Sequence, residues 1–164
     1  MAIRKIIELG TDDVLRKHAR KVERFDDRLA ELLDDMAETM YAGNGAGLAA
    51  PQVGVLKRCC VIDVQDGAGL IELVNPEIVS SEGECTVIEG CLSVPGRAGR
   101  VVRPEKVHVK AQDRHGEPFE LDGEGMLAVC LCHEIDHLDG IVYVDKMIED
   151  VTKQMEQRRK EEAK

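Results

Sequence analysis

The middle of the chain restricts the fold most, because short β-prone runs alternate there with turn-forming residues. The separators are typical of tight turns: Asp66-Gly67, Asn75-Pro76, Ser81-Glu82-Gly83 and Arg114-His115-Gly116. Connections this short join antiparallel strands, since a parallel pair needs a crossover of about a dozen residues or more. The sequence therefore predicts mostly antiparallel sheets with strands at 58–64, 70–74, 84–88, 101–112 and 118–121.

Helices are expected on both sides of this β-prone region. Gly43-Asn44-Gly45 ends a run over 26–41 in which apolar residues recur every three or four positions, as in an amphipathic helix: Leu29, Leu32, Leu33, Met36 and Met40. A second strong helix is predicted over 124–138. A short helix over 12–19 and a charged C-terminal helix at about 149–164 complete the pattern.

The composition argues against nucleic acid and membranes as partners. The formal net charge is −10 and aromatic residues make up 2% of the chain, so a phosphate backbone is repelled and bases find no stacking surface. The apolar runs are shorter than the roughly 20 residues that span a bilayer. Six cysteines without the spacing of a disulfide scaffold, and no apolar signal segment after Met1, predict reduced thiols in a cytoplasmic protein.

The helix predicted over 124–138 contains His133-Glu134-Ile135-Asp136-His137, an H-E-x-x-H motif. Four residues give about 400° of turn and about 6 Å of rise, so both imidazoles project from one face and suit one metal ion. Glu134 lies at the rim of that site, where a general base would act. The motif also occurs by chance in surface helices, but its apolar flanks predict a buried helix, in which a histidine pair needs a partner.

These elements predict a single domain over 1–164. We expect an α+β fold in which mostly antiparallel short sheets pack around the central C-terminal H-E-x-x-H helix.

A catalytic ion usually has three protein ligands, so a third ligand is needed in addition to the two histidines. A third histidine six residues further on is absent, because that position is Tyr143. A distant Glu is possible, although no second helix offers a suitable one. Cys130 faces the same side one turn earlier, but three ligands on adjacent turns of one helix converge poorly. Cys91 is better placed, just after a β-prone run where Gly90 lets the chain turn.

Three separated segments together resemble the signature motifs of bacterial peptide deformylases, in that family's order and approximate spacing. They are Gly45-Ala46-Gly47-Leu48-Ala49-Ala50-Pro51-Gln52, Glu89-Gly90-Cys91-Leu92-Ser93 and His133-Glu134-Ile135-Asp136-His137. The similarity extends over nearly the whole chain. It implies a metal-dependent hydrolase that removes the formyl group from the N-terminal formyl-methionine of newly made proteins.

The resemblance implies the roles of the reacting groups. Cys91, His133 and His137 would bind one divalent ion, commonly iron(II), which zinc, nickel or cobalt could replace. Glu134 would take the proton of the attacking water and pass it to the departing amine. The Gln52 side-chain amide and the Leu92 backbone N–H would stabilise the oxyanion.

The resemblance also implies how substrate binds. The segment containing Ala46 and Gly47 would run beside the peptide as an extra strand, where glycine permits close approach. A pocket for the methionine side chain would be lined at positions that core packing alone could also explain: Ala46, Val87, Met126, Val129 and Cys130. Ala46 is smaller than the branched residue often found there, which changes the shape of the pocket.

Two charged residues beside the motifs allow two interpretations. In one, Asp136 orients a metal ligand or pairs with Arg103 behind the ligands; in the other, the two form a solvated ion pair. The remaining histidines have no ligand-like spacing and are expected at the surface or on strands: His18, His108 and His115.

Two other functions use the same motif. A metallopeptidase lacks its usual third ligand here, and a noncatalytic metal-binding module would need Cys130 as a fourth ligand. The resemblance makes formyl-methionyl nascent peptides the partners. In some bacterial relatives the C-terminal helix docks on the ribosome, but residues 150–164 carry five cations and four acids, so any contact of this kind would be weak.

Overall fold

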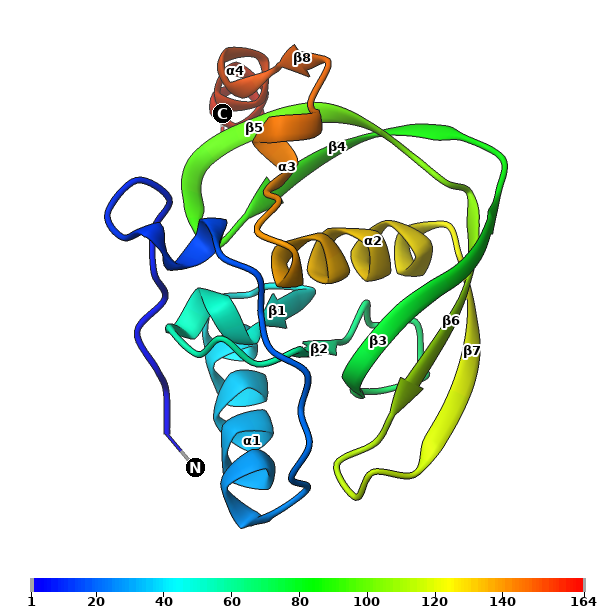
Figure 1. Cartoon of the computed structure of the whole chain (residues 1–164). Helices are drawn as coiled ribbons and strands as arrows, with labels where there is room; N and C mark the ends of the chain where they lie inside the picture. The colour runs from blue at the N-terminus through cyan, green and yellow to red at the C-terminus, as the bar shows by residue number, and fades with distance from the viewer. Residues whose placement is uncertain (1, 164) are drawn as a thin grey trace.

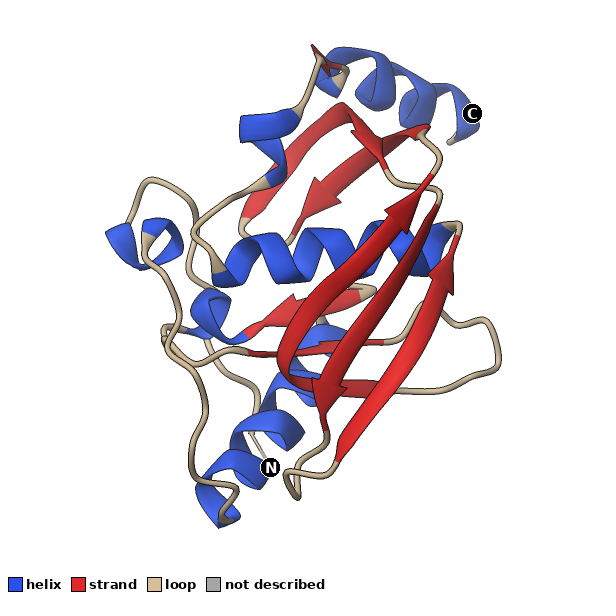
Figure 2. Cartoon of the chain, turned by 45° about the vertical axis from the view of Figure 1, so that its right-hand side comes forward, coloured by secondary structure: helices blue, strands red, loops and turns tan. Residues whose placement is uncertain are grey.

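Helix α2 (Met126–Leu138), which carries the H-E-x-x-H motif, runs through the middle of the molecule between two antiparallel sheets (Figures 1 and 2). The computed structural model describes residues 2–163. Most of α2 is buried, and its side chains pack against both sheets, with β1, β2 and β7 as its main neighbours in the larger one. The predicted α+β fold, with short antiparallel sheets around this helix, is confirmed.

The larger sheet has the strand order β1-β2-β3-β6-β7, and every neighbouring pair is antiparallel. Its strands are β1 (Gly47–Ala49), β2 (Cys59–Ile62), β3 (Ile71–Glu82), β6 (Lys106–Gln112) and β7 (Pro118–Glu124). The smaller sheet consists of β4 (Cys85–Cys91), β5 (Val94–Arg103) and β8 (Glu149–Asp150), in that order.

Two strand predictions need correction. The run over 101–112 was expected as one strand, but Pro104-Glu105 divide it into β5 and β6, which belong to different sheets. Proline fixes its φ angle and has no N–H to donate to a strand pair, so the chain turns at this point. The strand expected over 70–74 continues to Glu82 as β3.

Asn75 explains why a turn was expected inside β3. Its φ of 50° is left-handed, and the pairing between β3 and β6 shifts register just after it. The side chain then binds both backbone groups of Val22, with its Oδ1 accepting from the N–H at 2.8 Å and its amide donating to the carbonyl at 2.9 Å. The Asn-Pro pair therefore produces a bulge that anchors the segment before α1, and not a chain reversal.

Helix α1 (Asp27–Ala42) agrees with the helix predicted over 26–41. Its N-cap is Asp26, whose carboxylate accepts the Leu29 N–H at 3.1 Å, and its apolar face packs against β1 and β2. The first predicted helix shortens to a 3₁₀ turn, η1 (Asp13–Arg16). Short elements that the sequence did not predict are β1, β8, α3 (Tyr143–Lys146) and the 3₁₀ turn η2 (Ala50–Val53).

The C-terminal helix α4 (Thr152–Glu162) lies against β5, the middle strand of the smaller sheet (Figure 1). Thr152 Oγ1 accepts the Ala98 N–H at 3.2 Å, and none of the helix residues is buried. Within the described chain, residues 2–163, no helix has the length and apolarity needed to span a bilayer.

Candidate active site and metal centre

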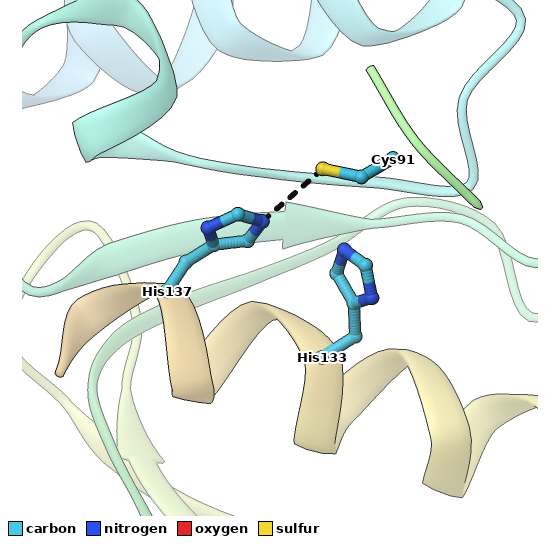
Figure 3. Close-up of side chains that lie close together, drawn as sticks. All are labelled: Cys91, His133 and His137. Carbon is cyan, nitrogen blue, oxygen red and sulfur yellow. Dashed lines mark hydrogen bonds between the residues drawn. The ribbon is translucent and has the colours of Figure 1, made fainter. Parts of the chain in front are cut away.

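The three predicted ligands meet between β4 and α2, although Cys91 lies more than forty residues before the two histidines in the chain. Cys91 ends β4, and His133 and His137 project from successive turns of α2 toward it (Figure 3). One ligand atom from each lies within 4.8 Å of the other two, and Cys91 Sγ is 3.3 Å from His137 Nε2. A thiolate and two imidazoles at this spacing suit a transition-metal ion with a coordination position left open.

Glu89 fixes the orientation of His133. Its Oε1 is 2.7 Å from His133 Nδ1, so the imidazole keeps that proton and turns Nε2 toward the ligand group. His137 is fully buried, and this burial lowers its pKa and favours the neutral form that binds metals. The donor set therefore fits a divalent ion.

Arg103 holds Glu89 in turn. Its guanidinium donates to both Glu89 oxygens, at 2.6 and 2.9 Å, and to Asp136 Oδ2 at 2.8 Å. Burial alone would raise the pKa of Glu89, but hydrogen bonds from His133 and Arg103 lower it to about 2. Arg103 is 2% exposed, so its contact with Asp136 is not a solvated ion pair. Through Glu89, the buried Arg103 instead supports the candidate ligand His133.

Glu134 is almost completely buried beside the ligand group. Burial raises the pKa of its carboxyl to about 7, near the value at which a group exchanges protons efficiently at neutral pH. Its Oε1 has no hydrogen-bond partner within residues 2–163. A Cβ added to Gly47 would lie 2.5 Å from Glu134 Oε2. The glycine of β1 therefore allows the carboxylate to occupy this place.

Gln52 points its amide at the same centre. Its Oε1 accepts the Ala49 N–H at 3.0 Å, which leaves the NH₂ group to donate to Ser93 Oγ at 3.0 Å and Cys91 Sγ at 3.4 Å. The turn η2 buries this side chain to 1% exposure. Leu92, the other predicted oxyanion residue, follows Cys91 and lines the adjoining pocket.

All of the predicted substrate residues line one pocket of about 450 Å³, which also contains Glu134, Gln52 and Cys91. They are Ala46, Gly47, Val87, Met126, Val129 and Cys130. The pocket lies beside β1, which within residues 2–163 pairs only with β2 and is an edge strand of its sheet. Cys130 is not a member of the ligand group formed by the described residues, and burial raises the pKa of its thiol to about 12.

Sequence reasoning did not identify Glu89 and Ser93 as parts of this site. Both lie in the Cys91 motif, but their contacts are with side chains 44 and 41 residues away. One signal was available for Glu89, since a buried histidine ligand usually donates its second ring N–H to an acceptor. No comparable signal identifies Ser93.

A buried H-E-x-x-H helix, a thiolate from a separate strand and a carboxylate beside an open pocket define the class of metal-dependent hydrolases. Comparisons with known proteins specify the family. Residues 3–153 match the family model described as polypeptide deformylase. The peptide deformylase of Caldicellulosiruptor bescii is 61% identical over 160 residues, 97% of this chain and 95% of that protein. That of Acetivibrio thermocellus is 60% identical over 98% of this chain and 93% of that protein.

Solved structures agree with this result. The crystal structure of a peptide deformylase from Legionella pneumophila has a TM-score of 0.86 and 56% identity, covering 96% of this chain and 92% of that one. A peptide deformylase from Synechococcus elongatus in complex with actinonin has a TM-score of 0.84 and 41% identity, with coverage of 92% and 81%. The chain belongs to the polypeptide deformylase family.

Proposed function

We propose that this chain hydrolyses the N-terminal formyl group of formyl-methionyl nascent peptides, with Cys91, His133 and His137 as the ligands of a divalent ion. The observation that carries the proposal is the convergence of the three ligand atoms in the wall of a pocket that also contains the buried Glu134. Membership of the polypeptide deformylase family supports the same reaction. A metallopeptidase or a noncatalytic metal module has no comparable support.

The ligand set suits several metals. One thiolate and two imidazoles accept iron(II), zinc, nickel or cobalt, and we assign iron(II) as the native ion. When bound, the ion would act as a Lewis acid and lower the pKa of water. Because a thiolate donates more charge than a third imidazole, the ion would be a weaker Lewis acid, and the reaction would depend more on Glu134.

Glu134 would move the proton. With its pKa raised to about 7 by burial, the carboxylate can accept a proton from the attacking water at neutral pH. The same group would then give this proton to the amine as the C–N bond of the formamide breaks. Its unpartnered Oε1 supports this role, because a carboxylate already occupied by hydrogen bonds would be a poorer base.

Gln52 and Leu92 would stabilise the negative oxygen of the tetrahedral intermediate. The Gln52 amide is held by the Ala49 N–H with its donors toward the Cys91 side of the site. Such orientation before the reaction is what makes an oxyanion donor effective. The Leu92 backbone N–H would be the second donor.

The peptide would bind along the edge of β1. Main-chain pairing to an edge strand depends little on sequence, which suits an enzyme that must act on many different nascent chains. The methionine side chain would enter the pocket lined by Ala46, Val87, Met126, Val129 and Cys130, while Gly47 would allow close approach of the peptide backbone.

The reaction would take place in the cytoplasm, where nascent chains arise. Helix α4 would contribute at most a weak ribosome contact, since its surface mixes charges of both signs: Lys153, Glu156, Arg158, Arg159, Lys160, Glu161 and Glu162. The sequence of α4 contains no aromatic residue on which a base could stack.

Selectivity for the formyl group tests the proposal. We expect hydrolysis of formyl-Met peptides and a kcat/KM at least about a hundredfold lower for the matching acetyl-Met peptides. The extra methyl group of the acetyl substrate must fit beside Glu134 and Gln52, and it makes the carbonyl less electrophilic. Together these effects are expected to raise the activation free energy by about 3 kcal/mol, which corresponds to this factor. Comparable hydrolysis of both substrates contradicts the proposed function.

A further inference from the structure

A groove of about 550 Å³ lies on the side of the molecule where the segment leading to α1 meets the loop that leaves η2. Its two walls are joined by backbone hydrogen bonds, from Arg20 N–H to the Leu56 carbonyl at 3.0 Å and from Arg58 N–H to the Arg20 carbonyl at 2.9 Å. In Figure 1 the blue coil between η1 and α1 crosses this loop. The Asn75 side chain forms hydrogen bonds with both backbone groups of Val22. The groove is therefore part of the ordered fold.

Four exposed cations border the groove, and we call them the groove cations: Arg20, Lys21, Arg24 and Lys57. Glu23 is the only acid in its lining, which leaves a local net charge of three positive units. Within residues 2–163, none of the groove cations forms an ion pair or donates a side-chain hydrogen bond. Elsewhere many arginines are paired, as Arg100 is with Glu149 at 3.1 Å and Arg114 with Glu72.

This arrangement is unusual for a chain with a net charge of −10. Acids outnumber bases 32 to 22, and yet these four bases are grouped around one groove, share it with a single acid and form no ion pair among the described residues. From this grouping we infer that the groove binds the phosphate backbone of RNA, without reading its bases. At physiological salt the Debye length is about 8 Å, so distant acids of the same protein are screened while phosphates in contact with the groove cations are not.

The lining of the groove argues against base stacking and against binding to a membrane surface. Val22, Val55 and Leu56 line it, with no aromatic side chain among the groove residues, so bases have no ring to stack on. None of the large exposed apolar residues belongs to the groove, and a membrane surface would need such residues as anchors besides the cations. A chain of phosphates requires only cations spaced along an open surface.

The choice of RNA rests on the proposed function, because formylated nascent peptides are presented by ribosomes, which expose RNA. The groove lies near the reacting groups in the chain: η2 contains Gln52, and the Gly54 N–H donates to the Pro51 carbonyl at 3.0 Å. Contact here would thus hold the enzyme close to its substrate by a surface separate from the pocket and from α4.

Binding of a fluorescein-labelled 20-nucleotide poly(U) RNA to the metal-loaded enzyme, measured by anisotropy from 50 to 200 mM salt, tests the inference. Four phosphate contacts predict a slope of log K against log salt of about −3, since each contributes about −0.7 on a single strand. The variant Lys21→Gln/Lys57→Gln should reduce the slope by about 1.4 and weaken binding at 50 mM salt by about tenfold or more. The matched control is Lys106→Gln/Lys110→Gln, which removes the same charge from β6 and should bind as the wild type does.

Each result decides the inference. A wild-type slope near zero, or equal losses in the two double variants, overturns it. Equally tight binding of poly-glutamate also overturns it, because the groove would then accept an acidic polypeptide as readily as RNA. Hydrolysis of a short formyl-Met peptide is measured in parallel, and its kcat/KM should be the same in all three proteins. A wild-type enzyme that hydrolyses the peptide but does not bind RNA refutes only the groove, whereas a wild-type enzyme that binds RNA but does not hydrolyse the peptide refutes only the proposed function.

Discussion

At the scale of single residues, the environment of Glu134 carries the strongest chemical prediction. The variant Glu134→Gln keeps the shape of the side chain but cannot accept a proton, so we expect kcat to fall by a factor on the order of 10² to 10⁴. Metal content should stay at the wild-type level, because Glu134 is not one of the three convergent ligands. Steady-state kinetics and metal analysis of the same preparation check both parts. A variant with wild-type kcat would show that another group moves the proton.

The two cysteines near the centre are predicted to differ in the same kind of experiment. Cys91→Ala removes a candidate ligand and should lose the ion, whereas Cys130→Ala trims a pocket wall and should retain it. Metal content after gel filtration, together with the number of thiolates seen by absorption of a cobalt-loaded sample, provides the measurement. Equal loss in both variants would favour a closed structural site with two thiolates.

What the sequence predicts at this scale depends on distance along the chain. His133, Glu134 and His137 share one helix, so helical geometry alone relates them. Glu89 and Arg103 contact each other across the hairpin of β4 and β5, and Glu89 then reaches α2. Those contacts depend on how a sheet packs on a helix, which no local pattern specifies.

At the scale of elements, the pairing of β6 with β7 contains a pH-dependent interaction. His108 on β6 lies between two carboxylates of β7, with Nε2 2.8 Å from Glu120 and Nδ1 2.7 Å from Asp122. These two hydrogen bonds raise the pKa of His108 above its usual value. Because the folded pKa is higher than the unfolded one, the protonated histidine favours the fold, fully below the unfolded pKa of about 6.5, and the contribution disappears as pH rises through the folded pKa.

We therefore expect His108→Gln to lower the free energy of unfolding at pH 6 and to have a smaller effect at pH 9. Urea denaturation of wild type and variant at both pH values measures the difference. His115→Gln is the control, because the exposed His115 side chain has no hydrogen-bond partner within residues 2–163. A loss that is the same at both pH values would mean that His108 acts by packing and not by charge.

Element boundaries were predictable where periodicity is strong and not where tertiary contacts decide. The regular apolar spacing of α1 predicted that helix to within about one residue, and α2 was predicted to within about two residues. Strand β1 has three residues and only forms because β2 lies beside it. Asn75 shows a third case, since a residue pair typical of turns is used as a bulge once β3 pairs on both sides.

At the scale of the whole molecule, the candidate metal centre joins parts that the sequence keeps apart. Cys91 belongs to the smaller sheet, while the histidines lie on the helix that packs against both sheets. Short connections predicted antiparallel sheets, but they did not predict that β3 pairs with β6 while β4 and β5 form a separate sheet. The order of strands depends on which faces the helix covers. The prediction of one domain over 1–164 stays a prediction.

The openness of this centre leads to the last prediction, which concerns the ion. Cys91 is only partly buried and lines the same pocket that substrate would enter, so dissolved oxygen can reach a thiolate bound to a redox-active metal.

We expect enzyme loaded with iron(II) under nitrogen to be the most active form and to lose activity in air. Zinc should bind at least as tightly by the general affinity order but give a slower, air-stable enzyme. The protein would be stripped, reloaded with iron, zinc, nickel or cobalt under nitrogen, and its kcat/KM compared before and after exposure to air. An iron form that is stable in air, or a zinc form that is equally fast, would contradict iron(II) as the native ion and leave the ligand proposal intact, because metal content of the Cys91→Ala variant tests the ligands separately.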